Sequence, residues 1–287
     1  MDISVHLYED AKPFSAAAGD FLQSRAVHHN LILTVLDRRL TRPEPGYYWV
    51  AARAGQAAGV VVQSPRTRSA LLVPMEPSVI EALVDAIADA GDVLPGAIGD
   101  AATAASFAGR WAEQCKSAAF PTQGLRLYEL AELKPTGPFE GTLRKAETAD
   151  RSLAISWIQE FYTEVHEPHE EQVERQVDDW LTSGNLWVWE NGEAVSIAVS
   201  QKPIQGVVRV SHVYTPPENR RRGYAAACVY GISKYCTEAG YRCVLYTDLG
   251  NPTSNAIYRR IGYRAVAEAI HYRFDGSQGK SPAEASR

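Results

Sequence analysis

Apolar residues along the first half of the chain recur with two periods, one helical and one alternating. Residues 15–40 carry them at helical spacing and predict helix. Residues 47–62, YYWVAARAGQAAGVVV, predict two strands joined by a turn at Gly55. Helical spacing returns over residues 78–87, with Ser78 as the predicted cap. The other elements expected in this half are strands over 69–75, 93–98 and 124–133 and a helix over 101–115.

The second half follows a segment rich in proline and glycine, residues 135–141, which we interpret as a linker. The dipeptide Asn191-Gly192 is a strong hairpin signal, and it separates two apolar runs. A short helix near Asn255 is expected to be capped by Ser254 or Thr253 and to end at Gly262. The remaining expected elements are strands over 142–146, 186–189, 195–199, 207–215, 243–246, 263–266 and 270–274 and helices over 149–165, 170–181 and 224–239.

The two halves repeat one pattern. Residues 49–65 and 187–203 each read as a strand led by tryptophan, a glycine turn, a second apolar strand and a proline. A further strand and a helix follow in both, so we infer two copies of one α/β fold. The predicted domains are residues 1–134 and 142–275, joined by the linker and followed by a flexible tail over 276–287.

Candidate chemistry gathers in residues 207–227, VVRVSHVYTPPENRRRGYAAA. The strand ends at Pro216, three arginines and Gly223 form a loop, and alanines then open a helix. The first backbone amides of a helix have no intrahelical partner, and the helix dipole favours anions there. The loop therefore predicts an anion site suited to phosphate, which Gly223 lets a ligand approach closely. The alternative is a solvated basic turn before an ordinary helix.

These residues carry a family resemblance. Arg220-x-x-Gly223-x-Ala225 resembles the acetyl-CoA pyrophosphate loop of the GCN5-related N-acetyltransferases, the GNAT family. The segment from Asn251 to Tyr263, with Ser254-Asn255-Ala256-Ile257-Tyr258 inside it, resembles that family's second cofactor motif. The resemblance covers the C-terminal half in detail. It implies two tandem GNAT-like units, each with a mixed, mostly antiparallel twisted sheet flanked by helices.

The resemblance also implies a reaction and a site. The protein would transfer an acetyl group from the co-substrate acetyl-CoA to a primary amine on a small molecule or peptide, without a metal. Tyr258 would act as general acid to the CoA thiolate, and a backbone amide at the end of the 207–215 strand would stabilise the oxyanion. The residues expected to bind the cofactor are Val213, Tyr214, Thr215, Arg220, Arg221, Arg222, Gly223, Tyr224, Ala225, Ala226, Asn251, Ser254 and Tyr258. The first copy lacks the loop motif, having VPMEPSVIEAL instead, so we expect it to bind no pyrophosphate.

The general base for the amine is open. Where relatives place a glutamate on the strand before Asn251, this chain has Tyr246, with Asp248 two residues on and expected on the same strand face. Asp248 is the base we predict. The other candidates are Glu160, Glu164, His166 and His212, and a base acting through water is an alternative to all of them. The acidic run FYTEVHEPHEE hints at a cationic acceptor.

Composition and charge exclude some classes of function. The formal net charge of −5 disfavours nucleic-acid binding. The sequence contains no run of about 20 apolar residues, so we expect no membrane span. Four cysteines without metal-ligand spacing suggest reduced thiols in a cytoplasmic protein. We expect a monomer or a homodimer. A second functional hypothesis is a non-catalytic acyl-CoA sensor or scaffold. A nucleotide-phosphate binder is disfavoured because the loop lacks both a P-loop ending and G-x-G-x-x-G.

Overall fold

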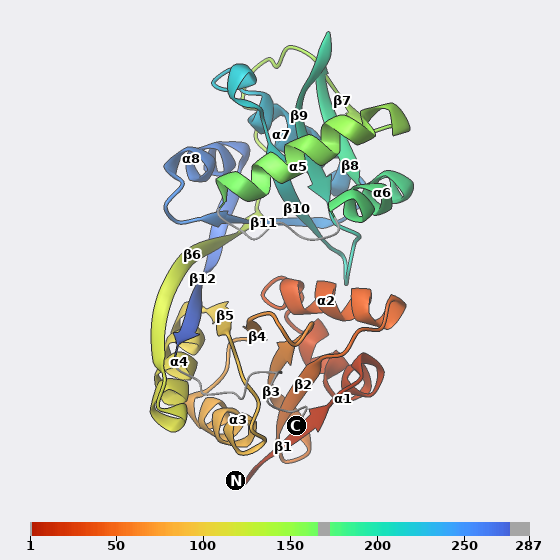
Figure 1. Ribbon diagram of the computed structural model, residues 1–287. Helices are drawn as coiled ribbons and strands as arrows, with labels where there is room; N and C mark the ends of the chain where they lie inside the picture. Colours follow the sequence, from red (N-terminus) through yellow and green to blue (C-terminus); the bar gives the residue numbers. More distant parts are fainter. Residues whose placement is uncertain (1, 166–172, 276–287) are drawn as a thin grey trace, which may run out of the picture. The chain divides into compact units, whose positions relative to one another are not determined.

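The computed structural model describes residues 2–165 and 173–275, and its contacts divide them into two compact units. The first unit comprises residues 2–126, 248–250 and 267–275, and the second comprises the described part of 127–247 together with 251–266. Two long strands, β6 (Ala118–Leu130) and β12 (Tyr263–Asp275), contribute residues to both units (Figure 1). The linear boundaries expected at residues 134 and 142 stay a prediction, as does the tail, which lies outside the described residues.

The first unit alternates strands and helices in a fixed order. Its elements are β1 (Ile3–Tyr8), α1 (Ala11–Gln23), α2 (Asn30–Thr41), β2 (Tyr47–Arg53), β3 (Gln56–Gln63), β4 (Ala70–Leu72), α3 (Pro77–Asp89), β5 (Gly96–Asp100) and α4 (Ala101–Cys115), followed by β6. Strands β1 to β5 are neighbours in that order, and residues 269–273 of β12 pair with β5.

The second unit repeats this order. Its elements are β7 (Thr142–Lys145), α5 (Arg151–Glu164), α6 (Val173–Ser183), β8 (Leu186–Asn191), β9 (Glu193–Ser200), β10 (Val207–Tyr214), α7 (Tyr224–Glu238), β11 (Arg242–Asp248) and α8 (Pro252–Ile261), followed by β12. Short 3₁₀ turns precede α5 and follow β10. Strands β11, β10, β9, β8 and β7 are neighbours in that order.

Sheet pairing confirms the internal repeat. In each unit the first three pairings, β1–β2–β3–β4 and β7–β8–β9–β10, are antiparallel. The fourth, β4–β5 or β10–β11, is parallel, and the helix α3 or α7 provides the crossover between the two parallel strands. Each unit therefore has a mixed, mostly antiparallel sheet flanked by helices, as expected.

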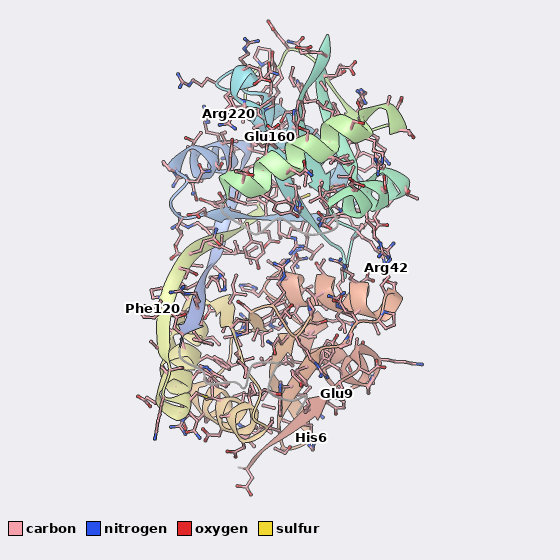
Figure 2. All side chains as sticks on the ribbon, viewed as in Figure 1. His6, Glu9, Arg42, Phe120, Glu160 and Arg220 are labelled. Atoms are coloured by element: carbon pink, nitrogen blue, oxygen red, sulfur yellow. The ribbon has the colours of Figure 1, made fainter. Side chains whose placement is uncertain are left out.

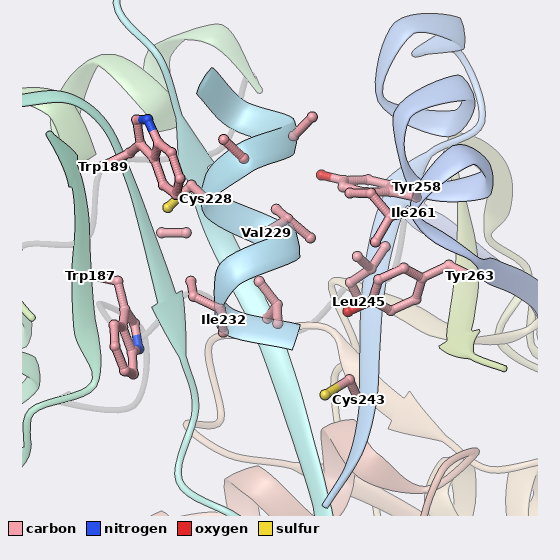
Figure 3. Close-up of a cluster of buried hydrophobic side chains, with 14 of the residues drawn as sticks. Trp187, Trp189, Cys228, Val229, Ile232, Cys243, Leu245, Tyr258, Ile261 and Tyr263 are labelled. Atoms are coloured by element: carbon pink, nitrogen blue, oxygen red, sulfur yellow. The ribbon is translucent and has the colours of Figure 1, made fainter. Parts of the chain in front are cut away.

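Helices cover both faces of the second sheet because its strands alternate apolar residues toward each side. Val208, Val210, Cys243 and Leu245 pack in one buried cluster with α7 and Tyr258 of α8 (Figure 3). On the other face, Val188, Ile197, Val199 and Tyr214 pack with α5 and α6. In the first unit, α3 and α4 share a core with residues from β2 to β5 that includes Phe107 and Trp111.

Several expected elements are corrected. The single helix over 15–40 is two helices, α1 and α2, and β1 precedes them. Helix α3 begins with Pro77 after Glu76, so Ser78 is not its cap. Asn251, rather than Thr253 or Ser254, caps α8. The two strands expected over 263–266 and 270–274 are one strand, β12.

Candidate functional site

Strands β10 and β11 are paired along only part of their length. Their parallel register runs from Val207–Arg242 to Val210–Leu245, whereas β10 continues to Tyr214 and β11 to Asp248. Between Ser211 and Tyr214 the register of β10 against β9 also shifts, and His212 adopts a positive φ of 49°. These features mark a β-bulge, which bends a strand and ends regular pairing. The sequence did not predict it.

The bulge leaves strand-like backbone at the end of β10 without a β11 partner. Tyr214 pairs with Ile197 of β9, and its carbonyl accepts a 2.8 Å hydrogen bond from the Ser196 hydroxyl. Because backbone groups alternate in direction along a strand, those of Val213 point to the opposite side, where β11 would pair. An extended ligand with amide groups can add there as a further strand.

The loop before α7 exposes the helix N-terminus. Gly223 is its N-cap residue, with φ 84° and no side-chain hydrogen bond to the first turn. A Cβ at Gly223 would meet no atom within 4 Å, and residues 220–223 are exposed. Arg221 also has a positive φ, 63°. The first-turn amides of α7 therefore have neither an intrahelical partner nor a side-chain cap, which is the geometry of an anion site.

Arg220 braces this loop against α5 and β10. Its guanidinium pairs with the Glu164 carboxylate, and its Nε donates to the Thr215 carbonyl at 2.9 Å. The pairing with Glu164 is the main cause that raises the pKa of Arg220. Figure 2 labels Arg220, together with Glu160 of α5, in the second unit. Arg220 therefore holds the loop, and Arg221 and Arg222 are the exposed cations next to it.

Helix α8 is fixed at its first turn by polar side chains. The Asn251 side-chain oxygen accepts from the Ser254 amide at 3.0 Å, and the Asn251 carbonyl accepts from the Asn255 side chain at 2.7 Å. Asn255 in turn accepts from the Tyr128 hydroxyl at 3.0 Å. The helix ends at Gly262, which has φ 111°, as expected. This bonding sets the direction in which Tyr258, one turn later, projects.

Tyr258 projects from α8 toward α7 and is buried (Figure 3). Its ring packs edge-on against Tyr128 and Tyr263, with centroids 6.3 and 6.2 Å away. Burial raises the pKa of Tyr258 to about 12, against the opposing effect of a hydrogen bond with the Ser254 hydroxyl. The phenol is therefore protonated at neutral pH, as a general acid must be. Tyr258 also shares one buried cluster with Tyr224 and Ala226 of α7.

Other predicted bases already have polar partners. Asp248 belongs to the first unit by its contacts, and its carboxylate accepts from the Gly250 amide at 2.6 Å and from the Gln123 side chain at 3.2 Å. Glu160 accepts from the Tyr214 hydroxyl at 2.6 Å. Burial and that bond raise the pKa of Tyr214. His166 lies outside the described residues.

His212 sits in the bulge inside a ring of aromatic side chains. Its Nε2 lies 3.1 Å from the Tyr162 hydroxyl, its Nδ1 lies 3.0 Å from the Ser211 hydroxyl, and Trp180 and Phe161 contact its ring. Burial, helped by the Arg209 charge, lowers the pKa of His212 to about 3. The imidazole is therefore neutral at neutral pH, with both nitrogens already engaged, which disfavours it as a base.

Residues 153–263, from α5 to the start of β12, match the family described as "Acetyltransferase (GNAT) family". This part of the chain therefore matches a GNAT domain. The matched range contains the end of β10, the α7 loop and all of α8. A comparison with curated proteins finds no match.

GNAT structures resemble the whole chain. A GNAT acetyltransferase from Colwellia psychrerythraea covers 95% of this chain and 100% of its own, with 10% identity and a TM-score of 0.63. A GCN5-related N-acetyltransferase from Sphaerobacter thermophilus covers 94% and 95%, with 15% identity and a TM-score of 0.62. A tandem GNAT protein from the clavulanic acid biosynthesis pathway covers 98% and 100%, with 10% identity and a TM-score of 0.55. At these identities the likeness concerns the fold, and it agrees with two tandem units.

Within residues 2–165 and 173–275, no group of three or more His, Cys, Asp or Glu side chains is arranged to hold a metal ion. No helix in the same part of the chain is long and apolar enough to cross a membrane.

Proposed function

We propose that this protein transfers an acetyl group from acetyl-CoA to a primary amine, and that the second unit performs the reaction. The observation that carries the proposal is the divergence of β10 from β11 close to an uncapped helix N-terminus. The first feature suits the amide-bearing pantetheine arm, and the second suits the pyrophosphate of the same cofactor. Among the ligands of the family, acetyl-CoA requires both.

Acetyl-CoA would lie with its pyrophosphate on the amides of residues 221–226. The dipole of α7 and the charges of Arg221 and Arg222 favour an anion at this place. The pantetheine arm would continue along Val213 to Thr215 as an added strand. Asn251 and Ser254, at the first turn of α8, would line the arm from the side of Tyr258.

The chemistry follows from this placement. The amine nitrogen attacks the thioester carbonyl, a C–N bond forms and the C–S bond breaks. A backbone N–H at the end of β10 stabilises the oxyanion of the tetrahedral intermediate. Tyr258 gives its proton to the leaving thiolate, so CoA departs as a thiol. The nitrogen loses one proton, which returns to Tyr258 through water, and the products are an amide and CoA.

Calorimetry with acetyl-CoA tests the cofactor site. Gly223→Glu places a carboxylate where the pyrophosphate would lie and should abolish binding that the wild type shows. Gly240→Glu is the matched control, because Gly240 has φ 83° against 84° for Gly223 and equally open space, but follows the other end of α7. Equal binding by wild type and Gly223→Glu, or no binding by the wild type, would contradict the proposal.

The non-catalytic sensor is separated from the enzyme by amine dependence. An N-acetyltransferase releases free CoA at a rate that rises with an added amine, and the release is detected with a thiol reagent. A sensor binds acetyl-CoA with the same Gly223 dependence but releases no CoA with any amine. The buried and protonated Tyr258 favours the enzyme.

A further inference from the structure

Arg209 is a cation on the α5–α6 face of β10. Its neighbours Val208 and Val210 point into the core shared with α7, so Arg209 points to the opposite face. It pairs in the sheet with Val244 of β11, one residue before the last pair of the parallel register. The side chain of Arg209 therefore leaves the sheet next to the point where β10 and β11 diverge.

Arg209 is half-buried and lies near Tyr246 and His212. Burial lowers the pKa of its guanidinium. Tyr246 of β11 lies two residues beyond Val244 and on the same face of the sheet. Its negative charge, when the phenol is ionised, opposes the lowering of the Arg209 pKa. The positive charge of Arg209 also contributes to the lowered pKa of His212.

Arg209 has no acidic partner among residues 2–165 and 173–275, and Tyr246 has no hydrogen-bond partner there. Four other arginines of the second unit, in contrast, each pair with a carboxylate. Arg144 pairs with Asp150 and Glu190, Arg151 with Asp178, Arg220 with Glu164 and Arg242 with Glu129.

A guanidinium withdrawn from water without a counter-ion destabilises the folded state. Such a cost is typical of groups that serve a ligand rather than the fold. We infer that Arg209, with the hydroxyl of Tyr246, binds a carboxylate of the acceptor, so that the acceptor is an amine that also carries a carboxylate. This inference rests on the proposed acetyl transfer and names the substrate class of that site.

The donor set fits a carboxylate in number and charge. The planar guanidinium presents two parallel N–H groups to the two carboxylate oxygens, and the phenol adds a third donor. One positive charge balances one negative charge, whereas a doubly charged phosphate would call for more cations. Glu160 lies on α5, which packs over the same face, and its carboxylate, which accepts from the neutral Tyr214 hydroxyl, adds negative charge there for the ammonium of a zwitterionic acceptor.

Three variants test the inference. Arg209→Met removes the charge and keeps the length of the side chain, and Arg209→Lys keeps the charge without the planar fork. Arg264→Met is the control, because Arg264 is exposed in the same unit. The probes are three pairs that differ only in a carboxylate: phenylalanine and 2-phenylethylamine, lysine and 1,5-diaminopentane, and β-alanine and ethylamine. O-phosphoethanolamine represents the phosphate alternative.

Binding to the CoA-loaded protein is measured by calorimetry for every probe, together with kcat/KM for acetyl transfer. At least one carboxylated probe should bind wild type and Arg264→Met about 100-fold more tightly than Arg209→Met. The affinity of Arg209→Lys for that probe should lie between these two values. The counterpart of the probe that lacks the carboxylate should bind all the variants with equal affinity. Acetyl-CoA binding should be the same in all four proteins.

Thermal unfolding separates a binding role from a structural one. Arg209→Met should unfold at the same temperature as wild type or a higher one, because an unpaired charge is removed. A lower melting temperature would mean that Arg209 supports the fold and would overturn the inference. So would carboxylated probes that bind wild type and Arg209→Met equally, or tighter binding of the phosphate probe. Failure of acetyl transfer itself is recognised separately, from acetyl-CoA that neither binds nor reacts.

Discussion

The hydroxyl of Tyr258 is the atom on which the proposed mechanism depends most. Tyr258→Phe removes the proton donor and keeps the ring that packs against Tyr128 and Tyr263. We expect kcat/KM to fall by about 100-fold, within the range usual for general acid catalysis, while the affinity for acetyl-CoA changes little. Because the pKa of Tyr258 is about 12, the phenol is protonated across neutral pH. The ratio of wild-type to variant kcat/KM should therefore be constant from pH 6 to pH 10.

Tyr263→Phe is the matched control for Tyr258→Phe. Tyr263 is also buried in the same cluster, and its hydroxyl lies 2.8 Å from that of Ser233. Loss of this hydrogen bond should lower the free energy of unfolding by about 1 kcal/mol without the loss of kcat/KM. Equal losses of activity in the two variants would show that Tyr258 acts through packing alone.

His212 predicts how stability depends on pH. Its pKa is about 3 in the folded chain, below the ordinary 6.5, so the unfolded chain takes up a proton first as the pH falls. The stability due to neutral His212 is therefore complete above pH 6.5 and is lost as the pH falls toward 3. His212→Asn, which suits a positive φ, should remove this contribution. Between pH 6 and 4 the wild type should lose about 1.4 kcal/mol per pH unit more than His212→Asn.

Urea unfolding at several pH values measures this difference. His6→Asn, which changes an exposed histidine of β1, serves as control and should follow the wild type. Parallel curves for wild type and His212→Asn would mean that His212 titrates normally in the folded chain. In that case His212 would return to the candidates for the general base.

At the scale of one element, Asn251 couples the stability of α8 to the site. Asn251→Ala removes the side-chain oxygen that accepts from the Ser254 amide, and should cost about 1 kcal/mol of unfolding free energy. Asn251→Asp keeps that acceptor and should recover most of it. Because α8 carries Tyr258, kcat/KM should fall in the alanine variant and recover in the aspartate variant. Urea unfolding and steady-state kinetics measure these effects. If the cap were unimportant, Asn251→Ala and Asn251→Asp would give equal values in both measurements.

Elements with a strong local pattern could be predicted from sequence. Helix α4 and the two hairpin turns follow from alanine-rich helical spacing and from glycine turns, and Gly55 and Gly192 both have positive φ. Helix ends were harder to predict from the sequence, because several residue types can cap a helix. The break between α1 and α2 has no glycine or proline, and it coincides with the buried His29, whose Nδ1 lies 3.0 Å from the Leu22 carbonyl. Such tertiary contacts leave no periodic signal.

The candidate site shows the same division. The α7 loop and α8 were found because their residue types occur at fixed spacing in one continuous segment. The bulge at His212 and the bond between Tyr214 and Glu160 were missed, since they depend on pairing across strands and between elements. Arg209 lies in a strand without a motif, and only its lack of an acidic partner among residues 2–165 and 173–275 draws attention to it.

At the scale of the whole chain, the repeat predicts function in one unit only. Both units have the same order of elements, but β4 has three residues and helix α3 begins with Pro77 instead of a glycine loop. Glu76 stands at the N-cap of α3, and its exposed carboxylate pairs with Arg53 at 2.8 Å without a hydrogen bond to the first turn of the helix. Its negative charge near this helix start disfavours a pyrophosphate there. Met75 lies against Gly59, where it fills space beside the same helix start.

We therefore expect one acetyl-CoA per chain. Calorimetry should give one equivalent for wild type and none for Gly223→Glu, and Glu76→Gln should not add a second site, because Pro77 and Met75 still replace the loop. Two equivalents in wild type, with one retained in Gly223→Glu, would assign cofactor binding to the first unit as well. The first unit would then need an anion site built differently from the amides of a helix start, since its sequence offers no glycine there.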